Sequence, residues 1–490
     1  MKRLICILLL LALSFTFMVA CDGSKNDGNN GDGAAGQVND EYMDEDGNYI
    51  PRFEVKDWEG RDFNIIVRGE SYGTYQSDDF TTKSELYGEL IEDAVKKRND
   101  KVETTYNVKI NVEKTDDVLG KVRLACSSSL DTYDAIMPSL RELSSLASEG
   151  YLWDLTELEN FDIDAPWYDK NCTDAFAIQD KIFFTTGDIT ILNKVNTPHI
   201  LFNKEMASKH FPEEDFYQLV RDNKWTFDKM VESAQEVASI SSPDGSYSDQ
   251  NIYGMVTAYG DPGAFYGASG ELICGKDEDN LPYLMIGTTE RSVTLAKKIL
   301  DTYNNADWLI YAQDCEAPIW ETSFAIFYEG RSLFRPGVFS ATTKLRKLSQ
   351  IEFGVLPMPL MDETQDKYYS YCTTGATAGI AVPTSAGNPE FSAYMIEVCS
   401  AWAKNYLTPA YYEINLRYRD LRDDESEEML DLIFSNIVYD IGECYNFGDY
   451  TGMFSNLAQM GSSDVASAIE TRKNEAQSRI DELIATYSFE

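Results

Sequence analysis

The chain has 490 residues, 43% of them hydrophobic and 12% aromatic, which is enough apolar material for a large core and enough length for two lobes. It carries 82 acidic and 42 basic residues, for a formal net charge of −40. Because phosphate binding needs clustered Lys and Arg, this balance argues strongly against nucleic acid as a partner.

Residues 1–20 have the pattern of a secretory signal peptide, with two basic residues before an apolar run from residue 4 to residue 20. The run is short for a stable membrane span. Ala20 directly precedes Cys21, which resembles the bacterial lipobox with Met18 in place of the usual Leu. The resemblance implies that Cys21 becomes the mature N-terminus and carries a lipid. The alternative is an ordinary cleaved signal with an incidental cysteine.

Residues 21–50 are predicted to be a flexible tether, because the sequence from 22 to 40 is rich in Gly, Asn and Asp and nearly free of apolar residues. The segment 31–36 matches G-x-G-x-x-G, but no strand precedes it and no helix follows it, so we reject a dinucleotide site. The acidic residues there also lack the spacing of an EF-hand.

Strand and helix signals alternate from residue 62 onward. Apolar runs or alternation predict strands at 62–69, 107–114 and 133–139, and helical spacing predicts helices at 84–106, 118–128 and 140–150. Repeated βαβ units of this kind imply a mainly parallel sheet covered by helices.

A second α/β block starts at residue 198. Its strand signals lie at 198–206, 251–259, 322–337 and 351–360, and Thr226 is a plausible cap for a helix over 227–237. The segment 379–407 is typical of a strand, a turn and a helix opened by Asn388 and Pro389, and the remainder of the chain is predicted to be helical.

The order of several segments resembles the extracellular solute-binding proteins of ABC importers, in the sugar-binding, maltose-binding-protein-like group. The matching segments are 133–158, 198–206 before 225–234, 328–337, 353–360 and 381–398. The resemblance implies an α/β, two-lobed periplasmic-binding-protein-like fold of type II, with interleaved lobes joined by a hinge.

In that fold the chain crosses between the lobes near Asn196, Gly375 and Tyr411. The N-terminal lobe would then combine residues 51–197 with 376–411, and the C-terminal lobe residues 198–375 with 412–490. Three shared crossings form a hinge that can close over a ligand.

The resemblance also places ligand contacts at the strand ends that face the cleft. We expect these contacts from Glu70, Tyr72, Ser139, Arg141, Asp261, Phe265, Tyr266 and Phe339, with Arg335 and Tyr371 as weaker additions. Sugars need aromatic faces beside polar and charged groups, and this set supplies both. The alternatives are structural. Phe265 and Tyr266 would pack the core, and Arg141 would pair with Glu142 or a helix end. Glu70 would be a solvated loop charge, and Asp261 a turn residue before Pro262.

The function implied is a lipid-anchored receptor on the extracytoplasmic face of a bacterial cell membrane. It would act as a monomer, bind a small solute, expected to be a carbohydrate, and deliver it to permease subunits without a cofactor. The alternatives are a surface-anchored glycoside hydrolase and a receptor for peptides or another non-sugar solute.

Motifs for catalysis or metal binding are missing from the sequence. The two histidines, His199 and His210, form no H-E-x-x-H motif, and there is no G-x-S-x-G or P-loop. Seven cysteines follow Cys21 without C-x-x-C spacing, so a zinc site is not expected and at least one thiol stays unpaired in a monomer.

Overall fold

The computed structural model describes residues 40–488, apart from 82–86, 243–245, 349–350, 363 and 417–423. The signal peptide, Cys21 and most of the expected tether therefore lie outside the described residues. Residues 40–50, which we assigned to the tether, are folded. Tyr42 is buried against Trp167, and Tyr49 accepts and donates backbone hydrogen bonds with the side chain of Asn405 at 2.8 Å. Their aromatic side chains bury enough surface to order this segment.

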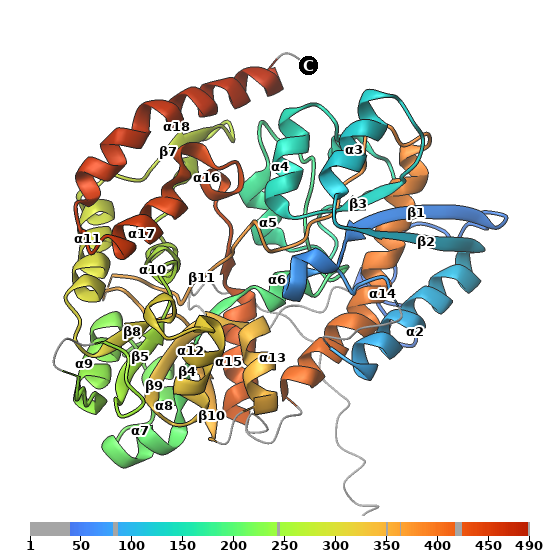
Figure 1. Ribbon diagram of the computed structural model, residues 1–490. Coiled ribbons are helices and arrows are strands. Elements are labelled where there is room, and N and C mark those ends of the chain that lie inside the picture. The colour runs from blue at the N-terminus through green and yellow to red at the C-terminus, as the bar shows by residue number, and fades with distance from the viewer. Residues whose placement is uncertain are drawn as a thin grey trace, which may run out of the picture. The chain divides into compact units, whose positions relative to one another are not determined.

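The first sheet has three parallel strands in the order β2-β1-β3. They are β1 (Arg61–Arg68), β2 (Val108–Thr115) and β3 (Ala135–Met137), linked by helices α2 (Glu89–Tyr106) and α3 (Val118–Ser127). Figure 1 shows α2 beside this sheet. The predicted βαβ units are confirmed, and they bring the carboxyl ends of β1 and β3 to one edge.

A segment from much later in the chain completes this part of the fold. Ala381 bridges to Ile136 of β3, and Ile380 bridges to Thr185. Helix α14 (Pro389–Leu416) follows and packs along α2. Its start is as predicted, with the Asn388 side chain accepting the backbone N–H of Phe391 at 3.0 Å.

The second sheet has five strands in the order β10-β4-β9-β5-β8. They are β4 (Pro198–Asn203), β5 (Tyr253–Thr257), β8 (Leu309–Tyr311), β9 (Ser332–Val338) and β10 (Phe353–Leu356). β5 runs parallel to β8 and β9, but β4 is antiparallel to β9 and β10. The second sheet is therefore mixed. The sequence did not predict the direction of β4, because the hydrophobic pattern of a buried strand does not encode direction.

Helices cover the second sheet and continue beyond it. Those of this region are α7 (Lys204–His210), α8 (Phe216–Arg221), α9 (Phe227–Val237), α10 (Asp261–Ala268), α11 (Glu290–Asn304), α12 (Ile319–Tyr328), α13 (Phe339–Leu348) and α15 (Asp424–Ser435). The predicted cap of α9 is confirmed, since the Thr226 hydroxyl accepts the N–H of Lys229 at 3.1 Å.

Short elements make up the rest of the described chain. They are η1 (Asp40–Tyr42), η2 (Glu70–Tyr75), α4 (Leu140–Ser148), η3 (Leu155–Glu157), α5 (Lys170–Phe176), α6 (Leu192–Val195), β6 (Cys274–Lys276), β7 (Pro282–Leu284), η4 (Ala312–Asp314), β11 (Ser370–Tyr371), β12 (Ile437–Val438), α16 (Ile441–Cys444), η5 (Phe447–Asp449) and α17 (Tyr450–Gln459), with the long α18 (Val465–Ser488).

The C-terminal segment packs against elements of the first sheet's region. The Tyr439 hydroxyl donates to Asp169 at 2.6 Å, the Ser144 hydroxyl donates to the carbonyl of Cys444 at 2.9 Å, and the ring of Tyr487 lies 4.8 Å from that of Phe183. Residues Glu41–Glu490 form one compact unit, so these contacts join the two sheets' regions closely. The lobe boundaries that we drew from the resemblance stay a prediction.

The seven cysteines of the described residues are all free, and six of them are buried. Within the described ranges, no helix is both long and apolar enough to cross a membrane.

Candidate functional site

The carboxyl ends of β1 and β3 carry a first group of polar side chains: Tyr72, Ser139, Arg141 and Glu142. Together with Glu443 of α16 we call them the first-sheet cluster. Ser139 caps α4, since its hydroxyl accepts the N–H of Glu142 at 3.2 Å while the Glu142 carboxylate accepts the N–H of Ser139 at 2.8 Å. The Tyr72 hydroxyl donates to the same carboxylate at 3.1 Å. A capping box therefore fixes the carboxylate that orients Tyr72.

Arg141 joins this cluster to the C-terminal segment. Its Nη2 donates to the carboxylate of Glu443, and to the carbonyl of that residue at 3.2 Å. The other carboxylate oxygen of Glu443 accepts the hydroxyl of Thr374 and its backbone N–H, the latter at 3.1 Å. The alternative pairing of Arg141 with Glu142 is not the one present. Arg141 thus lies at a contact between distant parts of the chain.

Burial sets the electrostatics of this region. It raises the pKa of Tyr72 to about 12, and it raises the pKa of Glu443 against the opposing field of Arg141. Next to it, Asp440 accepts the hydroxyl of Tyr371 at 3.0 Å, and burial raises the pKa of Asp440 to about 6. Tyr371 is therefore a hydrogen-bonded partner of a buried carboxyl.

The second sheet carries the other group, the second-sheet cluster: Tyr259, Asp261, Tyr311, Asp314 and Arg335. The rings of Tyr259 and Tyr311 lie 4.5 Å apart, and the Tyr259 hydroxyl donates to Asp314 at 2.6 Å. Asp261 accepts the Thr257 hydroxyl at 2.5 Å and the N–H of Ala258 at 2.8 Å. Arg335 is 6% exposed, and burial lowers its pKa to about 10 while Asp261 opposes that change.

Three of the predicted contacts lie in the core instead. Phe265 has no exposed surface and packs against Phe227 and Tyr303. Tyr266 is 2% exposed, with its hydroxyl 2.8 Å from that of Ser292. Their positions follow from α10, whose buried residues include both.

Phe339 also has no exposed surface, and its ring stacks on His199 at 4.0 Å. His199 is buried, with Nε2 2.7 Å from the hydroxyl of Thr342, so it has a structural partner in the core. Glu70 is exposed at the start of η2.

The structure therefore brings together Tyr72, Ser139 and Arg141, and separately Asp261 and Arg335. Sequence reasoning missed Tyr259, Tyr311, Asp314, Glu142 and Glu443 as site residues. Tyr311 and Asp314 follow the short apolar run 308–310, and this strand signal could have identified them as strand-end residues. Glu443 has no such signal, because its partner Arg141 is 302 residues away.

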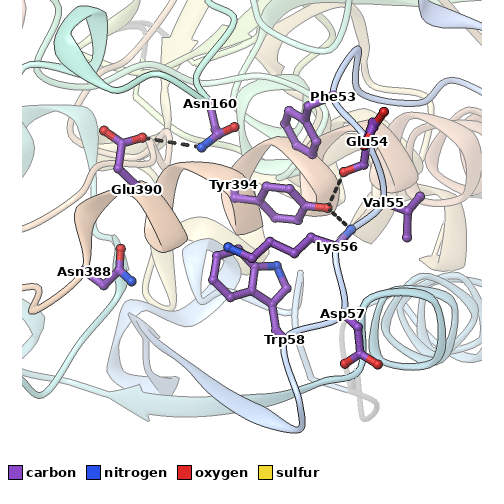
Figure 2. A pocket seen from close by; sticks show the side chains of 10 residues that line it. All are labelled: Phe53, Glu54, Val55, Lys56, Asp57, Trp58, Asn160, Asn388, Glu390 and Tyr394. Atoms are coloured by element: carbon purple, nitrogen blue, oxygen red, sulfur yellow. Dashed lines mark hydrogen bonds between the residues drawn. The ribbon is translucent and has the colours of Figure 1, made fainter.

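A cavity of about 690 Å³ lies elsewhere, before β1 and at the first turn of α14. Figure 2 shows Tyr394 between Phe53 and Trp58, with Glu390 to one side. The Lys56 ammonium lies 3.7 Å from the centre of the Trp58 ring and covers it. β1 has eight residues, so its length of about 26 Å separates this cavity from the first-sheet cluster.

Among the residues that the structure describes, no group of three or more His, Cys, Asp or Glu side chains is placed to hold a metal ion. What the two clusters offer is aromatic faces beside carboxylates, hydroxyls and guanidinium groups. This combination suits the binding of a polar, ring-containing solute.

No protein-family model matches the chain, and no curated protein sequence matches it. Solved structures do. The ABC substrate-binding protein Lmo0181 from Listeria monocytogenes, in complex with cycloalternan, matches with a TM-score of 0.54 at 13% identity, over 88% of this chain and 100% of that chain. A cyclo/maltodextrin-binding protein complexed with maltotetraose matches with a TM-score of 0.56 at 13% identity, over 87% of this chain and 97% of that chain. The chain has the α/β, two-lobed fold of these binding proteins, as the resemblance implied.

Proposed function

We propose that this protein is the solute receptor of an ABC importer and binds a carbohydrate between its two lobes. The observation that carries the proposal is the fold likeness to two substrate-binding proteins described with bound oligosaccharides, over 88% and 87% of the chain. In open α/β folds, ligands bind at the carboxyl ends of the strands, and residues of both clusters follow such ends: Tyr72, Ser139, Tyr259, Asp261 and Asp314.

The second-sheet cluster supports a sugar as the solute. Tyr259 is partly exposed and lies against Tyr311, so one ring can stack on the C–H face of a pyranose. Asp314 and Asp261 beside the rings supply acceptors for sugar hydroxyls. The first-sheet cluster adds the hydroxyl of Tyr72 and the guanidinium of Arg141 from the other lobe.

A thermal-shift screen of neutral and acidic oligosaccharides tests the proposal. A saccharide at one hundred times its dissociation constant stabilises the folded state by about 2.7 kcal/mol. The saccharide is then recovered and separated by chromatography, since a receptor returns it intact and a glycoside hydrolase returns its products. Mass spectrometry of solute that co-purifies with the protein adds ligands outside the panel. Binding of peptides in place of saccharides, or any turnover, contradicts the proposal.

A pair of variants locates the site. Tyr259→Ala removes the proposed stacking ring and is expected to weaken saccharide binding by about tenfold or more. Tyr283→Ala is the matched control, because Tyr283 is 45% exposed on β7 and belongs to neither cluster. Equal affinities of the two variants place the sugar elsewhere.

The proposal includes a lipid anchor on Cys21, at the extracytoplasmic face of a bacterial cell membrane, and delivery of the solute to permease subunits by a monomer. The sequence around Cys21 is its support. Mass spectrometry of the mature N-terminus tests the anchor: diacylglycerol on Cys21 is expected, and a Cys21→Ser variant should leave the membrane fraction. A mature chain that starts beyond Cys21 contradicts it.

A further inference from the structure

Arg335 of β9 makes a hydrogen bond from only one of its three guanidinium nitrogens within the described residues. Its Nη1 donates to the carbonyl of Ser323 at 3.2 Å. Its Nε is buried and has no hydrogen-bond partner, and its Nη2 makes no hydrogen bond within the described residues. Leaving a buried donor unpaired is costly, and a charged donor more so.

In two other arginines of this protein, the corresponding Nε and Nη2 atoms bind a carboxylate. Arg221 donates from Nε to one carboxylate oxygen of Glu428 at 3.2 Å and from Nη2 to the other at 2.7 Å. Arg123 donates from the same two atoms to Glu149, with Nε at 2.8 Å. These two N–H bonds run parallel, so they match the two oxygens of one carboxylate.

A second cation shares an aromatic ring with Arg335, although the whole chain is strongly acidic. Its guanidinium lies 4.2 Å from the centre of the Phe324 ring, and the ammonium of Lys344 lies 4.8 Å from the same centre. In the described part of the chain, no carboxylate oxygen lies within 4.0 Å of either cation. Asp261 acts on Arg335 through its field only, since its own hydrogen bonds go to Thr257 and Ala258.

An acid group beside Arg335 can therefore take up two parallel N–H donors, with the ammonium of Lys344 at the same Phe324 ring.

We propose that the carbohydrate bound by this receptor is acidic, and that a sugar carboxylate, as in a uronate, pairs with the Nε and Nη2 of Arg335. The proposal rests on the proposed function and narrows its substrate class. Lys344 supplies a second positive charge near this site, since its ammonium lies against the same Phe324 ring, and its side chain is exposed.

The experiment compares matched pairs of disaccharides by calorimetry: gluco-, galacto- and manno-configured compounds, each against its form with the C6 alcohol oxidised to a carboxylate. In at least one pair the acidic member is expected to bind about tenfold tighter or more, because a charge-assisted pair of hydrogen bonds is gained. The preference should shrink as NaCl screens the charges.

Three variants test whether Arg335 and Lys344 cause the preference for the acidic disaccharide. Arg335→Met and Lys344→Met should each reduce it, and Arg221→Met, whose N–H pair is already taken by Glu428, should leave it unchanged. Lys344 is exposed, so its variant keeps the test open if Arg335→Met does not fold.

The outcomes separate the two proposals. Neutral members that bind as tightly as the acidic ones, or a preference that survives both Arg335→Met and Lys344→Met, overturn the inference and leave the proposed function standing. Failure of every saccharide to bind overturns the proposed function, and the inference with it.

Discussion

Glu397 of α14 gives a quantitative test of how burial controls a carboxyl group in this fold. It is 1% exposed and accepts three hydrogen bonds, from the N–H of Asp162 at 2.7 Å, from Trp167 Nε1 at 2.9 Å and from the Tyr168 hydroxyl at 2.9 Å. Burial outweighs these bonds and raises its pKa from 4.5 to about 8. Between pH 4.5 and about 8, Glu397 therefore keeps its proton in the folded protein and releases it in the unfolded chain.

The free energy of unfolding should therefore fall as the pH rises. Below pH 4.5 the group is protonated in both states, and its stabilising contribution is fully present. As the pH rises toward about 8, the unfolded chain ionises first and that contribution is lost. The difference between 4.5 and about 8, at about 1.36 kcal/mol per pH unit, makes the loss about 5 kcal/mol.

The assay is urea unfolding of the wild type and of Glu397→Gln at several pH values across this range. Glutamine does not titrate, so the free energy of unfolding of the wild type should fall relative to that of the variant by about 5 kcal/mol as the pH rises. The other buried acids are present in both proteins and cancel. Glu390→Gln, at the first turn of the same helix, is the control and should follow the wild type. A wild-type minus Glu397→Gln difference that is constant with pH refutes the reasoning.

Further predictions concern stability and thiol chemistry. Glu443→Ala leaves the buried N–H of Thr374 without its acceptor and should lower the free energy of unfolding by about 2–4 kcal/mol in urea titrations, and a loss below about 0.5 kcal/mol would contradict this. Phe265→Ala opens a cavity in the core and should cost about 3–5 kcal/mol by the same measurement, whereas a near-neutral result would place its ring at the surface. Cys126 is the one partly exposed thiol of the seven described, so among these seven a thiol reagent should modify at most Cys126 in the native protein and the other six only after unfolding. Fast modification of a second thiol would count against the packing described here.

Local sequence signals predicted much of the fold because they reflect local physics. The Asn388 cap of α14 and the Thr226 cap of α9 each follow from a pattern within one short segment. The parallel strands β1 to β3 follow from strand and helix signals that alternate along neighbouring segments. The antiparallel placement of β4 was not predictable in this way, because its partners β9 and β10 lie more than a hundred residues further along the chain.

The candidate site was predictable only in part, for the same reason. Strand ends identified Tyr72, Arg141 and Asp261, because the end of a strand is a local signal. Whether an aromatic ring such as Phe265 turns into the core or toward solvent depends on neighbouring helices, and no pattern in its own segment decides it.

The way the first sheet is completed has a consequence for biogenesis. Residues 380 and 381 must reach Thr185 and Ile136 before that part of the fold is whole, so a growing chain cannot finish it until most of the polypeptide has been synthesised. Contacts so distant in sequence make folding slow. A newly made chain therefore stays unfolded for longer, which suits the export across a membrane that the proposed lipid anchor on Cys21 requires.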